Sequence, residues 1–220
     1  MKKRVINRGI ILALLLIMFR IVFIMYESYN FNKEKNDIET TVTNYTDEFM
    51  NNINNFHNKD ANKLNDCLSS YWMPSSEFYP DGTVSLDLFK NQIDALSKNE
   101  YADGEVEESK ITIKNVEIYN KGLNKARVKF DVDLEYKTLG YCGIIYPFGV
   151  LNAKSHMRYL NTDYARNEDK DNSIMAKEQG TRTVLKLHNL NVYLKKSGDE
   201  WKIDYCLIDD IMVNVLDKGK

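Results

Sequence analysis

The chain has 220 residues, of which 43% are apolar and 28% charged, so it is not a wholly disordered protein and is long enough to bury a core. Three prolines, ten glycines and three cysteines exclude a collagen-like chain and a disulfide-stapled scaffold. The formal net charge of −2 excludes a protein whose whole surface is built to bind nucleic acid.

The charge is divided unevenly along the chain. Residues 1–26 contain five basic residues and no acidic one, whereas residues 27–220 contain 25 basic and 32 acidic residues. An apolar segment occupies residues 5–26, with Arg20 close enough to its outer end to reach the interface, and roughly 20 residues suffice to cross a bilayer as a helix. The basic residues before Ile10 predict a cytoplasmic N-terminus and an extracytoplasmic remainder.

Two other interpretations of this segment stay open. The ten apolar residues Ile10–Phe19 have the length of the core of a cleaved signal peptide, although residues 20–30 contain no cleavage site of small residues. A buried helix of a soluble domain has a similar composition. We favour an uncleaved anchor with a cytoplasmic stub (residues 1–26), followed at residues 27–37 by a polar juxtamembrane linker or a continuation of the helix.

Three amphipathic helices are predicted next. Apolar residues recur at intervals of three and four in residues 38–57, 60–72 and 85–98, which is the helical period. The sequence MPSSEFYPDGT, between the second and third of these segments, carries two prolines and an Asp-Gly pair and is therefore predicted to be a loop.

The period then changes to that of strands. Residues 126–137 alternate apolar and polar side chains without a fault, which is typical of a half-exposed antiparallel strand. Residues 108–120 predict a partner strand with a bulge near Asn115, joined to it by the short loop NKGLN. A second hairpin is predicted from residues 183–196 and 200–209, with the turn Ser-Gly-Asp between them.

Two segments do not fit this pattern. Residues 139–182 form a long insertion between the hairpins, and its apolar stretch at residues 143–151 either folds onto the core or presents a surface to a partner. Residues 211–220 are expected to be a frayed tail.

Three helices followed by a four-stranded antiparallel sheet make an α+β architecture. With the terminal hairpin LNVYLKKSGDEWKIDYCLI, this order resembles the nuclear transport factor 2-like superfamily, a cystatin-like cone in which a curved sheet wraps around helices. The resemblance covers residues 38–210 and implies an extracytoplasmic domain of this fold, with residues 139–182 as a departure from the compact pattern.

The layout also resembles one inner subunit of type IV secretion and conjugation machines. That subunit has a short cytoplasmic N-terminus, one transmembrane helix and such a domain outside the membrane. The resemblance lies in this order of segments and in no single residue.

Histidines and cysteines give no recognisable metal or nucleophile motif. The three histidines, His57, His156 and His188, lack the local spacing of zinc ligands. The three cysteines, Cys67, Cys142 and Cys206, are widely spaced, and their odd number leaves at least one thiol free. A disulfide between two of them stays open, as does their redox state.

Two further patterns have a functional and a structural interpretation. Residues Asn167–Glu178 partly match a calcium-binding loop, but position 1 is Asn and position 6 is not Gly, so a solvated acidic loop is favoured.

The cone-shaped domains of this superfamily often contain a pocket. Six aromatic residues are candidates to line such a pocket or to fill the core instead: Tyr71, Trp72, Phe130, Tyr136, Trp201 and Tyr205.

The sequence predicts a single-pass membrane protein without enzymatic activity, cofactor or metal. Its domain is expected to be a scaffold or assembly subunit of an envelope complex, such as a conjugation or type IV secretion channel. The alternative is a membrane-tethered module that binds a small ligand or a cell-wall fragment. The expected partners are membrane lipid through residues 5–26, protein subunits of the complex and, as an open alternative, a second copy of the chain, but not nucleic acid.

Overall fold

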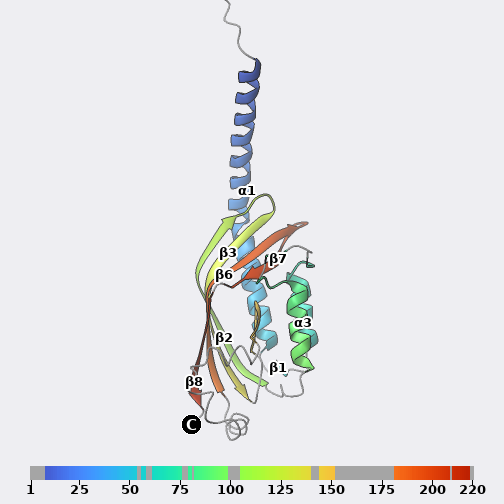
Figure 1. Ribbon diagram of the computed structural model, residues 1–220, viewed down its shortest axis with the longest axis vertical. Coiled ribbons are helices and arrows are strands. Elements are labelled where there is room, and N and C mark those ends of the chain that lie inside the picture. Colours follow the sequence, from blue (N-terminus) through green and yellow to red (C-terminus); the bar gives the residue numbers. More distant parts are fainter. Residues whose placement is uncertain are drawn as a thin grey trace, which may run out of the picture.

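The computed structural model describes residues 8–53, 56–57, 61–75, 79–80, 82–98, 105–139, 144–151, 181–208 and 210–218. Within these residues the chain is an α+β protein in which helices α1 (Arg8–Ile53), α2 (Ala61–Tyr71) and α3 (Leu86–Ser97) pack on an antiparallel sheet (Figure 1). The α+β class and the antiparallel sheet predicted from the sequence are confirmed.

Helix α1 combines the predicted anchor and the first predicted helix of the domain. It runs unbroken through residues 27–37, which contain neither glycine nor proline to interrupt it. The described helices therefore number three rather than four. The first half of α1 stands clear of the sheet, whereas the second half lies against it (Figure 1).

The buried face of the second half of α1 follows the predicted period. Ile38, Val42, Tyr45, Phe49 and Ile53 are all buried at intervals of three and four residues. The helix ends at Ile53, earlier than predicted, because the chain turns into a two-residue strand that pairs with the start of the sheet: β1 (Phe56–His57).

The sheet follows the order β1-β2-β3-β6-β7, and β8 also pairs with β6. The four central strands are those the sequence predicts: β2 (Glu105–Asn120), β3 (Lys125–Leu139), β6 (Thr181–Ser197) and β7 (Glu200–Leu207). All the pairings are antiparallel.

The predicted frayed tail is wrong for residues 210–218, which form strand β8 (Asp210–Lys218). The reason is the length of β6, which has 17 residues, whereas β7 pairs only with residues 191–197 of it. The first half of β6 thus offers a free edge, and β8 satisfies its backbone groups along residues 181–188.

Two β-bulges meet at Asp131, in the middle of β3. The register shifts between β2 and β3 at residues 114–117 and between β3 and β6 beside Phe130, and Asn115 and Asn189 both have a φ of 55°. The Asp131 carboxylate accepts hydrogen bonds from Asn115 Nδ2 at 2.7 Å and from the Asn189 backbone N–H at 3.0 Å. Bulges bend strands, so this carboxylate stabilises the curvature of the sheet. The predicted bulge near Asn115 is confirmed.

The inner face of the curved sheet is the alternating face of β3. The predicted set of residues is at most 1% exposed: Ala126, Val128, Phe130, Val132, Leu134 and Tyr136. Buried residues of α2 and α3, such as Leu64, Leu68, Phe89 and Ile93, complete the core.

Candidate binding groove between helix α1 and the sheet

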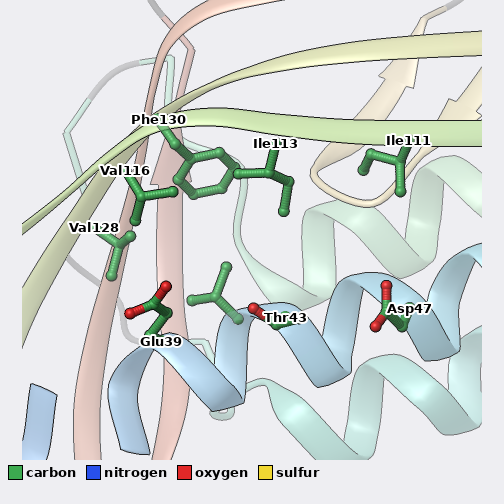
Figure 2. A pocket seen from close by; sticks show the side chains of 9 residues that line it. Glu39, Thr43, Asp47, Ile111, Ile113, Val116, Val128 and Phe130 are labelled. Carbon is green, nitrogen blue, oxygen red and sulfur yellow. The ribbon is translucent and has the colours of Figure 1, made fainter. Parts of the chain in front are cut away.

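An open groove of about 320 Å³ lies between the second half of α1 and strands β2 and β3 (Figure 2). This volume is at the lower end of the range that ligand-binding pockets occupy. Its lining residues are Glu39, Val42, Thr43, Asp47, Ile111, Ile113, Val116, Val128 and Phe130.

Helix α1 provides the polar side of the groove. Glu39, Thr43 and Asp47 are spaced by four residues, so they follow one another along the same face of the helix. This row lies next to the buried face that holds Val42, and all three side chains are exposed. In Figure 2 the row lies opposite the apolar side chains of the sheet.

The sheet provides an apolar floor. Ile111 and Ile113 point to one face of β2 by strict alternation, and the bulge at Asn115 inserts one residue so that Val116 continues that face. Val116 is 42% exposed, which is high for a valine in the middle of a sheet, and Phe130 lies buried beneath it. The bulge therefore keeps an apolar surface open to solvent.

The groove is suited to a ligand that is apolar along one side and positively charged along the other. Among the described lining residues, two are acidic and none is basic. Two carboxylates along one helix face create a negative potential, and the apolar floor gains free energy when it is covered. Lysine or arginine side chains beside apolar groups would satisfy both sides.

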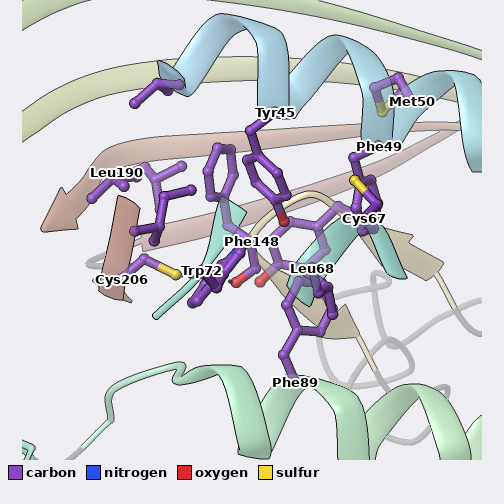
Figure 3. Close-up of a cluster of buried hydrophobic side chains, with 14 of the residues drawn as sticks. Tyr45, Phe49, Met50, Cys67, Leu68, Trp72, Phe89, Phe148, Leu190 and Cys206 are labelled. Carbon is purple, nitrogen blue, oxygen red and sulfur yellow. Dashed lines mark hydrogen bonds between the residues drawn. The ribbon is translucent and has the colours of Figure 1, made fainter. Parts of the chain in front are cut away.

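The space between the helices and the curved sheet is packed with side chains, as Figure 3 shows around Tyr45, Trp72 and Phe89. Tyr45 makes ring contacts with Phe148 at 5.8 Å and with Trp72 at 6.0 Å between centroids. Aromatic rings at such distances and tilts attract one another beyond the effect of burial.

The six aromatic candidates for lining a cavity mostly fill this core instead. Trp72, Phe130, Tyr136 and Trp201 are buried, whereas Tyr71 and Tyr205 are half-buried at its edge. Only Phe130 of the six borders the groove.

The apolar stretch of the long insertion folds onto the core. It contains a small hairpin of β4 (Ile144–Tyr146) and β5 (Gly149–Leu151), and Ile145, Tyr146 and Phe148 are at most 2% exposed. Of the two alternatives for residues 143–151, the described part supports the core.

Two buried tyrosines hold this hairpin in place. The Tyr45 hydroxyl donates a hydrogen bond to the Pro147 carbonyl, and the Tyr136 hydroxyl donates one to the Ile145 carbonyl at 2.8 Å. Buried carbonyl groups of a loop need such partners. Burial raises the pKa of the Tyr45 hydroxyl well above its ordinary value, so it remains a donor.

Cys67 and Cys206 are free and buried thiols. Burial raises the pKa of Cys67 to about 12, with the nearby Glu48 carboxylate as a second cause, and burial raises the pKa of Cys206 as well. Neither thiol is therefore an activated nucleophile. Cys142 lies outside the described residues.

The histidines that the structure describes form no metal-binding cluster. His57 lies in β1. His188 Nδ1 is 3.8 Å from the carboxylate of Asp131, the residue at which the two bulges meet. No group of three metal-ligating side chains occurs among the residues that the structure describes. His156 and the calcium-loop candidate Asn167–Glu178 lie outside them.

Similarity to known proteins is limited to the fold. No family model matches the chain, and no curated protein matches it. Two of the solved structures that match the chain each have a TM-score of 0.41. A scytalone dehydratase-like protein from Novosphingobium aromaticivorans is 10% identical, with 86% of this chain and 89% of that chain covered. A hexachlorocyclohexane dehydrochlorinase (LinA) of type 2 is 8% identical, with 84% and 93% covered. Both have the nuclear transport factor 2-like fold.

The prediction that the chain is not an enzyme is corrected to an open assignment, since these two structures are named as a dehydratase and a dehydrochlorinase. The prediction depended on the absence of local catalytic motifs, whereas an active site can be assembled from side chains that are distant in the sequence. At 8–10% identity, the likeness assigns neither a substrate nor a catalytic residue to this chain.

Sequence reasoning missed the polar side of the groove. The signal that was available is the row Glu39, Thr43 and Asp47, which adjoins the buried face of its helix at a constant spacing of four.

Proposed function

We propose that the protein is a membrane-anchored assembly subunit that binds a partner protein in the groove between α1 and the sheet. The observation that carries the proposal is the position of an open, acid-lined apolar groove on a domain continuous with an apolar helix. By length and composition this helix is able to cross a membrane, and its large apolar side chains from Ile10 to Tyr26 are exposed.

The anchor favours binding by a groove of modest size. The continuous apolar segment of α1 ends at Tyr26, and Glu39 follows 13 residues later, about 20 Å further along the helix axis. A partner in the same membrane would meet the groove at a high effective concentration, so a small contact would suffice. A segment with apolar side chains and flanking lysines or arginines is the occupant that the groove's charge and floor favour.

We also propose on which side of the membrane the domain lies and to which complex it belongs. A basic N-terminus predicts that the stub is cytoplasmic and that the domain at residues 38–210, with its insertion at 139–182, is extracytoplasmic. The order of stub, span and domain supports a subunit of an envelope complex such as a conjugation or type IV secretion channel.

In-cell cross-linking tests this proposal. The full-length protein would be cross-linked in cells and purified, and the proteins that accompany it would be identified by mass spectrometry. A Glu39→Lys, Asp47→Lys variant reverses the charge of the groove. A Glu108→Lys, Glu200→Lys variant changes the net charge equally at exposed positions outside it.

We expect the wild type and the control variant to recover the same envelope proteins, and the groove variant to lose one of them. If all three recover the same proteins, the partner does not use the groove. If the wild type is recovered alone, the assembly role fails, and a small ligand or cell-wall fragment becomes the better occupant of the groove.

A further inference from the structure

The turn between β2 and β3 lies beside α1 at the point where its apolar segment ends. Gly122 is in this turn, and a Cβ atom built on it would be 4.0 Å from Glu27 Oε1. Glu27 directly follows Tyr26, the last residue of the apolar segment. Figure 1 shows this turn beside α1, at the end of the sheet nearest the free half of the helix.

A neighbouring contact fixes the same end of the sheet to the helix. The Lys196 ammonium at the end of β6 pairs with the Glu34 carboxylate at 2.5 Å, and both side chains are partly buried. The Lys196 backbone N–H also donates to the Asn124 carbonyl in the β2–β3 turn at 3.0 Å. The turn is therefore held at a fixed height along α1.

The tip of the turn combines an exposed apolar side chain with two exposed cations. Leu123 is 55% exposed, and Lys121 and Lys125 on either side of it are also exposed. The exposed leucine lies at the height along α1 where the apolar segment of the helix ends, which is where a membrane interface would be. The two lysines beside it favour contact with a negatively charged surface.

The conformation of the tip is fixed by hydrogen bonds within the turn itself. The Lys121 backbone N–H donates to the Lys125 carbonyl at 3.1 Å, and the Lys125 N–H donates to the Gly122 carbonyl at 3.1 Å. The Gly122 N–H donates to Asn120 Oδ1 at 2.8 Å, and Gly122 and Asn124 have positive φ angles of 113° and 59°. A preformed tip binds without the entropy cost of ordering a loop.

We propose that the β2–β3 tip is a second membrane contact, in which Leu123 enters the lipid interface and Lys121 and Lys125 bind anionic phospholipid headgroups. This inference rests on the membrane span of the proposed function. The span and the tip together hold the domain at two points, which restricts its rotation about α1 and fixes the direction in which the groove opens.

Site-specific fluorescence on the full-length protein tests the contact. Leu123→Cys is labelled with the environment-sensitive dye NBD in a Cys142→Ser background, in which Cys67 and Cys206 are protected by burial. The control is Leu88→Cys, an exposed leucine on α3 outside the tip. Each protein is reconstituted into vesicles of phosphatidylcholine with 30% or no phosphatidylglycerol, with and without a headgroup-proximal spin-labelled lipid as quencher.

We expect strong quenching of the dye at position 123 in the anionic vesicles and weak quenching at position 88. Each lysine near an anionic surface strengthens the contact roughly fivefold, so a Lys121→Glu or Lys125→Glu variant should lower the ratio of bound to free tip by at least that factor. Omission of phosphatidylglycerol should have a similar effect.

Equal quenching at positions 123 and 88 would overturn the proposal, as would quenching at position 123 that does not depend on phosphatidylglycerol. Retention of the protein in the vesicles after alkaline carbonate treatment is measured in the same samples. If the protein is retained but the tip is not quenched, only the tip contact fails; if the protein is extracted, the membrane span fails as well.

Discussion

Replacement of Phe148 by alanine should destabilise the whole domain, because this side chain of the insertion fills the centre of the core. Phe148 is fully buried, and its ring contacts Tyr45 and Phe130 at centroid distances of 5.8 and 5.5 Å. Removal of a fully buried phenylalanine costs about 3–5 kcal/mol, which combines lost burial with the cavity that remains. In a domain of this size, that loss lowers the melting temperature by about 10 °C.

Urea unfolding of the full-length protein in detergent micelles measures this effect. The fluorescence of Trp72 and Trp201, both buried, reports the unfolding of the domain. Leu88→Ala is the control, since Leu88 is 43% exposed and its removal should cost less than about 0.5 kcal/mol. A loss below about 1 kcal/mol for Phe148→Ala would show that the β4–β5 hairpin is not part of the core.

Three further predictions concern buried or hydrogen-bonded groups. Tyr45→Phe leaves the buried Pro147 carbonyl without its partner and should cost about 1–3 kcal/mol in urea unfolding, and an unchanged midpoint would contradict that hydrogen bond. Asp131→Ala should cost about 1 kcal/mol at pH 7. Because the hydrogen bonds from Asn115 and the Asn189 backbone hold the Asp131 pKa below its ordinary value, this difference should persist above about pH 4 and vanish as the pH falls further; a difference independent of pH would refute the role. In a Cys142→Ser background, Cys67 and Cys206 should react with a maleimide at pH 8 only after unfolding, as measured by intact mass, and rapid labelling of the native protein would contradict their burial.

The sheet was the most predictable part of the molecule. Ala126 to Tyr136 alternate because one face of β3 is buried and the other is wet, and that pattern needs no knowledge of the partner strands. The bulge at Asn115 was also predictable, since the apolar alternation of β2 shifts by one residue there. In both cases the signal is local in the sequence.

Features that depend on distant segments were not predictable. Residues 210–218 contain apolar and β-branched residues typical of a strand, but where they pair depends on the half of β6 that β7 leaves without a partner. The burial of Phe148 depends on Tyr45 and Phe130, which lie far away in the chain. From the sequence alone, residues 143–151 could fold onto the core or present a surface to a partner.

The groove lies between these two cases. The spacing of Glu39, Thr43 and Asp47 places them on one face of a helix, and this is local information. The apolar surface opposite them becomes visible only when α1 is placed against β2 and β3. A row of polar residues beside a buried helix face is usually a solvated edge, so the sequence alone gives no reason to single it out.

Photo-cross-linking from inside the groove tests whether a partner protein binds there. The photoreactive residue p-benzoylphenylalanine would replace Thr43, which is exposed and lines the groove, or Leu88, which is exposed on α3, in the full-length protein in cells. We expect one discrete protein adduct from position 43, absent from position 88 and lost in the Glu39→Lys, Asp47→Lys variant. No adduct from position 43, or the same adducts from both positions, would contradict it.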